Sequence, residues 1–352
     1  MAWRTRNEVF AGNGSGRHGT ALAGNYLKVS VSGNGAAFAI LEEMEEKQQP
    51  GLRLRWFDRQ GRPRGEHVLP WHADHPLPQF CFNAAASRLL IADAASARIV
   101  VLSPEGQVLA EAGLFGEPRY SNERPLFLAA SIEEFFLLTQ AWPSTSSQSE
   151  KPVLICFSAD GQERWRQELA QGTAGGLAVS DEVHWILAGA YQLTSNQTQV
   201  RSSMQFFDRN GKLQATSEGL FRHAIFAQDG SRVLVMDRRQ ARLLGLPGGE
   251  LLWQSALPSR SEMFATTTGD ASLENIFALI ATSIFKGGRF VFEKARLVKF
   301  DAGGRHQLAA TLDSELIEPA LAVSREGKQL ALAAEGILRY YALLTAPKAA
   351  IE

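Results

Sequence analysis

The 352-residue sequence predicts an all-β fold made of seven repeated units, each with four strands. Three observations lead to this prediction: a polar turn closed by glycine recurs, a short apolar run recurs, and both return at intervals of roughly 40 to 55 residues. That interval is the length of one blade of a β-propeller, in which four-stranded antiparallel sheets stand around a central axis. The sequence therefore predicts a seven-bladed β-propeller. Six blades is the alternative, because the unit at residues 259–312 is the least regular.

The recurring turn joins the third and fourth strands of a unit. At residues 55–61 an apolar strand ends in Phe57, polar residues follow, and Gly61 closes the turn. Asp and Asn side chains bond their own backbone, and glycine adopts positive φ without strain. A type I turn closed by such a glycine predicts a β-hairpin with a bulge. The pattern returns at residues 101–106, 156–161, 206–211, 245–249 and 299–304.

Apolar runs precede these turns and predict the second strand of each unit. Short apolar runs bounded by turn residues suit strands that are covered on both faces. The third strand alternates instead, with Leu52, Leu54 and Trp56 separated by arginines, which is the period of a half-buried strand. The runs are at residues 38–41, 89–92, 135–138, 185–188, 233–236, 276–280 and 330–333.

Two tryptophans repeat the register as well as the turn. Trp165 lies four residues after Gly161, and Trp253 lies four residues after Gly249. This spacing resembles the quinoprotein-like and YVTN/WD40-like β-propeller repeats, and the resemblance covers nearly the whole chain. It implies a closed ring of blades and is specific for the fold rather than for a function.

The sequence predicts a single propeller domain spanning residues 1–352. The last unit has no room for a fourth strand, and residues 2–10 resemble the strands that carry Trp165 and Trp253. We therefore expect residues 2–10 to complete the last blade and close the ring, with residues 11–25 as a connector; closure removes an exposed sheet edge. The expected blades cover approximately residues 26–72, 73–117, 118–170, 171–220, 221–258, 259–312 and 313–345.

Composition narrows the function classes. The net charge is −1, so we expect no nucleic-acid partner. No apolar run approaches the length of a membrane-spanning helix. The chain as given predicts a cytoplasmic location, or a periplasmic one if a leader was removed. We expect Cys81 and Cys156 to be buried thiols too far apart for a disulfide. The sequence predicts a monomer and no cofactor.

Four connections between second and third strands are enlarged, at residues 42–50, 140–151, 191–203 and 282–294. Strand alternation places all of them on one face, together with the crossovers between units; we call this the crossover face. Enlarged loops confined to one face of a repeat fold predict a binding face, although surface loops also drift in length.

One of these connections, at residues 282–294, carries Phe285, Phe290 and Phe292. As an exposed hairpin, these aromatic residues would form a contact site. Alternatively, they pack onto the last blade.

The crossovers also bring charged side chains to the mouth of the central channel. Side chains of both charge signs at this position could bind a polar ligand. Alternatively, they form ion pairs with one another around a water-filled channel. The candidates are His75, Arg124, Arg222, His223, Glu262 and Glu318.

The only dense group of metal-capable residues is His72, Asp74 and His75, a weak metal candidate because the spacing has no recognised geometry. Asp93 and Asp237 end second strands at corresponding places, which predicts turn capping rather than paired-acid catalysis.

No sequence motif for catalysis is present, so the sequence favours a non-catalytic binding or assembly scaffold that uses the crossover face. One alternative is a metal- or quinone-dependent enzyme with its site at the channel mouth. Another is a sensor of small anions that uses Arg124, Arg222 and His223.

Overall fold

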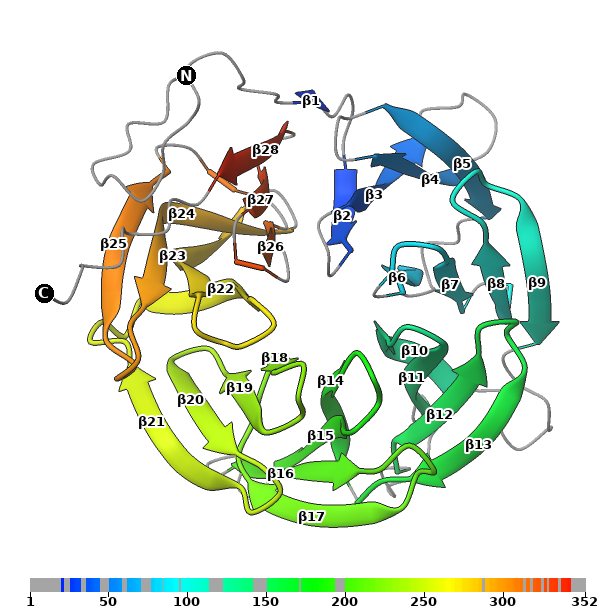
Figure 1. Cartoon of the computed structure of the whole chain (residues 1–352). Helices are drawn as coiled ribbons and strands as arrows, with labels where there is room; N and C mark the ends of the chain where they lie inside the picture. Colours follow the sequence, from blue (N-terminus) through cyan, green and yellow to red (C-terminus); the bar gives the residue numbers. More distant parts are fainter. Residues whose placement is uncertain are drawn as a thin grey trace, which may run out of the picture.

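The regular structure of the chain consists of β-strands arranged around a central axis in the computed structural model (Figure 1). The all-β propeller of four-stranded antiparallel blades predicted from the sequence is confirmed. The structure describes residues 20–21, 26–32, 36–44, 51–58, 62–70, 77–83, 85–94, 96–113, 123–141, 151–170, 172–193, 200–286, 289–312, 315–316, 319–323, 326–327, 329–334 and 337–342.

The described strands form seven four-stranded sheets, six of which contain four consecutive strands each, in order from the axis to the rim (Figure 1). Blade one contains β2 (Tyr26–Val31), β3 (Ala37–Met44), β4 (Gly51–Asp58) and β5 (Pro63–Pro70). Blade two contains β6 (Gln79–Phe82), β7 (Leu89–Asp93), β8 (Arg98–Leu102) and β9 (Val108–Gly113). Blade three contains β10 (Glu123–Ala130), β11 (Glu134–Ala141), β12 (Val153–Ser158) and β13 (Glu163–Glu168).

Blade four contains β14 (Thr173–Val179), β15 (Ile186–Leu193), β16 (Val200–Phe207) and β17 (Leu213–Glu218). Blade five contains β18 (His223–Phe226), β19 (Arg232–Met236), β20 (Gln240–Gly245) and β21 (Glu250–Ala256). Blade six contains β22 (Glu262–Gly269), β23 (Ile276–Lys286), β24 (Arg289–Phe300) and β25 (His306–Thr311). Neighbouring inner strands contact one another around the ring.

The seventh sheet is built from both ends of the chain. It combines β26 (Ala320–Val323), β27 (Gln329–Ala334) and β28 (Ile337–Ala342) with the short β1 (Thr20–Ala21), in which Thr20 pairs with Leu338. The sequence predicted seven blades, with six as the alternative because residues 259–312 form the least regular unit; those residues contain the complete blade six.

An N-terminal segment thus joins the last sheet, but not as the sequence suggested. The expected closing strand, residues 2–10, lies outside the described residues, and the described strand beside β28 comes from residues 11–25, taken as a connector. An edge strand pairs through its backbone N–H and C=O groups. A resemblance in side chains to the strands that carry Trp165 and Trp253 therefore could not identify the closing strand.

The glycine-closed turns form as predicted. Gly106, Gly161, Gly211 and Gly304 have φ between 75° and 89°, and each donates its N–H to the residue three before it. Each of the six hairpins between third and fourth strands in blades one to six carries a shift of register, which is the predicted bulge.

The hydrophobic core is divided among the interfaces between blades. Ala39 and Leu41 of blade one lie in one buried cluster with Phe80 and Ile91 of blade two, and similar clusters follow around the ring. Second strands are covered on both faces, as the apolar runs predict; all five residues of β7 are buried. Each blade therefore depends on its neighbours for burial.

The repeated tryptophans join successive blades. The Trp165 ring of blade three packs against Gly211 in the turn of blade four, and its Nε1 donates to the Arg209 carbonyl at 2.9 Å. Trp253 packs against Gly304 of blade six in the same way. Each tryptophan therefore packs on the turn glycine of the next blade and not on the glycine four residues before it in its own hairpin.

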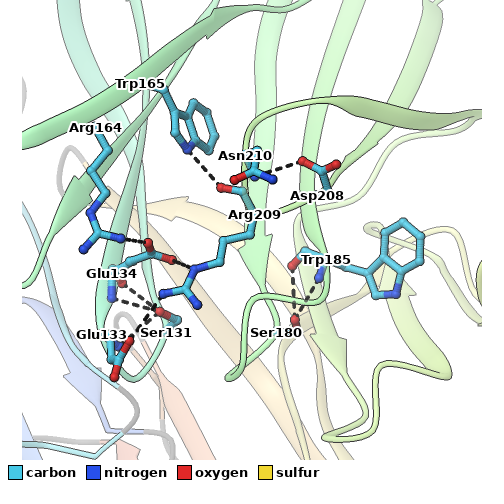
Figure 2. A network of polar contacts seen from close by, with 10 residues as sticks. All are labelled: Ser131, Glu133, Glu134, Arg164, Trp165, Ser180, Trp185, Asp208, Arg209 and Asn210. Carbon is cyan, nitrogen blue, oxygen red and sulfur yellow. Dashed lines mark hydrogen bonds and ion pairs between the residues drawn. The ribbon is translucent and has the colours of Figure 1, made fainter.

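A buried carboxylate reinforces the same interface (Figure 2). Glu134, at the start of β11, is 2% exposed and forms ion pairs with Arg164 of its own blade and Arg209 of blade four. The Ser131 hydroxyl accepts the Glu134 N–H at 3.0 Å. Because both arginines compensate the carboxylate, we interpret this network as structural.

Candidate functional site

The crossover face contains a pocket of about 710 Å³. Elements of four neighbouring blades form it: β2, the segment before β18, the β19–β20 turn, the β21–β22 crossover, the β23–β24 hairpin and the start of β26. The pocket therefore lies where crossovers between blades meet connections between second and third strands. The side chains that decide its chemistry are Lys28, Arg222, His223, Arg238, Arg239, Arg260, Glu262, Thr282, Ser283, Phe290 and Phe292.

The described lining of the pocket is strongly basic, with five cationic side chains against one carboxylate, that of Glu262. That carboxylate accepts a hydrogen bond from Arg296 at 2.5 Å, so its charge is already compensated. Among the described residues, no ion pair involves Arg238 or Arg260, and both side chains are exposed. The surface offers positive charge to an incoming group.

His223 lies in the pocket wall without adding charge. Burial, together with the positive charge of Arg222, lowers the pKa of His223 to about 4. Its Nε2 lies 3.2 Å from the Ala265 carbonyl, which only accepts, so Nε2 carries the proton. At neutral pH the ring is therefore an uncharged group with Nδ1 available as an acceptor.

Arg239 is held by its surroundings. Its Nη2 donates to the Leu257 carbonyl at 2.9 Å, while its buried Nε has no hydrogen-bond partner among the described residues. Lys28 contacts Gln79 at 2.5 Å and lies over the ring of Phe80. Arg239 and Lys28 are thus held in place by contacts within the protein.

An aromatic pair stands at the rim of this pocket. Phe285 and Phe290 face each other across the β23–β24 hairpin, with ring centroids 5.3 Å apart, and they are 68% and 60% exposed. Lys286, at the tip, pairs with Glu315 at 2.6 Å. Large exposed aromatic side chains next to arginines have the composition of interface anchors.

Phe292 behaves differently from its two neighbours. It packs on a buried cluster that contains Leu316 and Leu330, and its backbone exchanges hydrogen bonds of 2.9 and 2.8 Å with Leu316. The two alternatives for this hairpin therefore both occur: Phe285 and Phe290 are exposed, and Phe292 packs toward the seventh sheet.

The structure brings together some of the residues that the sequence singled out. Arg222, His223 and Glu262 line one pocket, with Phe290 and Phe292 in its wall and Phe285 next to Phe290. Arg124 lies in β10, but its side chain is outside the described part of the chain. The remaining candidates also lie outside the described residues: His72, Asp74, His75 and Glu318.

Sequence reasoning missed most of the positive charge. Arg238 and Arg239 occupy the tight β19–β20 turn, and Arg260 occupies the β21–β22 crossover. The sequence argument considered only the enlarged loops and passed over this short turn. The position of the turn on the crossover face was the signal that could have identified it. Lys28, in β2, had no comparable signal.

The described residues contain no group of three or more His, Cys, Asp or Glu side chains that could hold a metal. Asp93 and Asp237 cap their own turns, as predicted: Asp93 accepts from Ser96, and Asp237 accepts from the backbone of Arg239 and Gln240. The described part of the chain has no helix long and apolar enough to cross a membrane. The chemistry that the pocket supports is the electrostatic recognition of anions.

No family model and no curated protein matches the chain. Solved structures of β-propellers do match it. The Cps50 (Swd1) β-propeller domain of Myceliophteria thermophila shares 12% identity at a TM-score of 0.57, covering 92% of this chain and 98% of that one. The Dos1 propeller shares 11% identity at a TM-score of 0.58, covering 93% and 96%. The C-terminal WD40 domain of Sif2 shares 12% identity at a TM-score of 0.53, covering 92% and 98%. The resemblance to WD40-like propellers is supported at the level of the fold.

Proposed function

We propose that this protein is a non-catalytic scaffold that binds a protein partner through its crossover face. The observation that carries the proposal is the pair Phe285 and Phe290, two large aromatic rings 68% and 60% exposed beside a basic pocket. Water-exposed aromatic surface is stabilised when a partner covers it, and aromatic and arginine side chains dominate interface energies. The likeness to WD40-like propellers supports a binding role in general.

The rest of the pocket favours binding over catalysis. His223 is uncharged at neutral pH and its Nε2 faces the Ala265 carbonyl, while Glu262 is paired with Arg296. Among the described residues, no hydrogen bond joins either group to a nucleophile or to a second group that would pass a proton. Arg222, His223 and Glu262 therefore serve recognition in this proposal.

The test replaces both exposed rings, as Phe285→Ser with Phe290→Ser, and measures affinity capture from an extract of the source cells by mass spectrometry. A matched control places the same polar change on Val108 and Leu109, which are 54% and 44% exposed on β9 at the rim. The hairpin variant should lose a captured partner by at least about 2 kcal/mol, roughly thirtyfold in affinity, because it removes two anchors. The control should keep that partner.

Substitution is preferable to deleting residues 284–292. The deletion would remove the buried Val291 and the backbone bonds between Phe292 and Leu316, so a lost partner could reflect a damaged blade. Unchanged capture by a folded Phe285→Ser, Phe290→Ser protein would remove this hairpin from the binding site.

A further inference from the structure

We propose that the basic pocket receives an acidic peptide segment of the partner protein. This inference rests on the proposed function and names the chemistry that the crossover face recognises. Its basis is the concentration of five basic side chains, with one compensated carboxylate, among the described residues that line a single pocket, in a chain whose net charge is −1. A concave site lined by charge of one sign focuses the field and raises the local concentration of oppositely charged ligands.

The cations come from separate elements of the fold. Arg238 lies on the β19–β20 turn, Arg260 on the β21–β22 crossover, and Lys28 on β2. Distributed cations suit a ligand with several carboxylates along its length. The volume of about 710 Å³ falls within the range, about 300 to 1,000 Å³, of pockets that enclose a ligand larger than a simple ion.

The remaining lining matches a peptide better than a phosphate chain. Thr282 and Ser283 offer hydroxyl groups to backbone amides, and the carboxylate of Glu262 can accept a hydrogen bond from an amide N–H, a donor that a phosphate chain lacks. Met263 and Phe290 form an apolar wall beside the cations, which suits a side chain between acidic residues. The aromatic pair that anchors the partner continues into this wall through Phe290.

The probe is a fluorescein-labelled octapeptide that alternates acidic residues with one phenylalanine and one leucine, and its binding is measured by fluorescence anisotropy. A second peptide carries Gln and Asn in place of the acids. The acidic peptide should bind, and its affinity should fall as ionic strength rises from about 0.05 M to about 0.15 M, because the Debye length shortens. The amide peptide should bind at least tenfold more weakly, by an order-of-magnitude estimate for several lost charge contacts.

Charge reversal locates the site. Arg238→Glu with Arg260→Glu should weaken the acidic peptide by about tenfold or more. The control, Arg62→Glu with Arg305→Glu, changes net charge equally on turns between third and fourth strands, which lie on the opposite face. It should retain affinity within about twofold, since distant exposed charges are screened. Equal losses in the two variants, or equal binding of both peptides, would overturn the proposal.

Two further arms test other occupants. Tighter binding of inorganic triphosphate than of the peptide would assign the pocket to a small anion, and tighter binding of single-stranded polyuridine would assign it to nucleic acid; either result overturns the peptide assignment. The Phe285→Ser, Phe290→Ser variant separates this inference from the scaffold proposal. Capture that depends on the hairpin, without binding of the acidic peptide, refutes only the pocket assignment. Peptide binding without any hairpin-dependent partner refutes the scaffold proposal.

Discussion

The contact between tryptophan and the turn glycine of the next blade makes a quantitative prediction. Gly211 has φ of 77°, and a Cβ built on it would lie 2.9 to 3.0 Å from three ring atoms of Trp165. Gly249 has nearly the same φ, 71°, but a Cβ there would meet nothing within 4 Å. Alanine at either position bears the strain of the left-handed conformation, and only at Gly211 does it also collide with a ring.

The two costs can be separated in magnitude. Left-handed backbone costs a non-glycine residue about 1 to 2 kcal/mol, which is the expected loss of unfolding free energy for Gly249→Ala. Overpacking adds about 1 to 3 kcal/mol, so Gly211→Ala should lose about 2 to 5 kcal/mol. The ring cannot move aside freely, because Trp165 Nε1 is bonded to the Arg209 carbonyl.

Urea unfolding followed by far-ultraviolet circular dichroism measures both variants, and an unchanged m-value shows that the comparison is valid. A third protein places Gly211→Ala in a Trp165→Ala background, where the collision is absent. There, the glycine substitution should cost only about 1 to 2 kcal/mol, as at Gly249. Equal losses at Gly211 and Gly249, or an excess that survives without the Trp165 ring, would refute the reasoning about contact between blades.

Two further predictions follow from buried titratable groups. Burial, assisted by Arg222, lowers the pKa of His223 to about 4 against an ordinary value of 6.5, so the unfolded state binds more protons between these values and stability falls as pH falls. Between pH 7 and pH 5, the free energy of unfolding of the native protein should fall by about 2 kcal/mol more than that of a His223→Gln variant, as measured by urea unfolding. Equal falls in the two proteins would contradict the lowered pKa of His223. Burial raises the pKa of the Cys81 and Cys156 thiols to about 12, so both should resist iodoacetamide at pH 8 until urea unfolds the chain, and rapid labelling of the folded protein would contradict it.

Turn chemistry explains why so much of the fold could be predicted. The hydrogen bond that closes the turn at Gly211 joins it to Asp208, three residues earlier, and the bulge follows within the same hairpin. Such features depend on a few consecutive residues, so their sequence signal is strong. The alternation around Trp56 and the buried run of β7 are local in the same sense.

Ring closure was harder to predict because backbone pairing carries little side-chain information. β1 lies beside β28 as the outer strand of the sheet and consists of Thr20 and Ala21. It contains neither a tryptophan nor a turn glycine. The sequence indicated that an N-terminal segment was needed there, since the last unit lacked a fourth strand. It could not indicate which segment satisfies the exposed N–H and C=O groups.

The sequence by itself determined the propeller architecture, the bulged hairpins and the face on which the crossovers meet, because each follows from contacts between residues close in the chain. Only the tertiary structure decided that Lys28, Arg222, Arg238 and Arg260 line one pocket, and that Phe290 stays exposed while Phe292 packs toward the seventh sheet. Lys28 belongs to blade one, whereas the three arginines belong to blade five and to the segments beside it, so several blades separate them in the sequence. Their proximity arises when the ring closes and neighbouring blades bury one another's strands, an outcome of packing that no local pattern encodes.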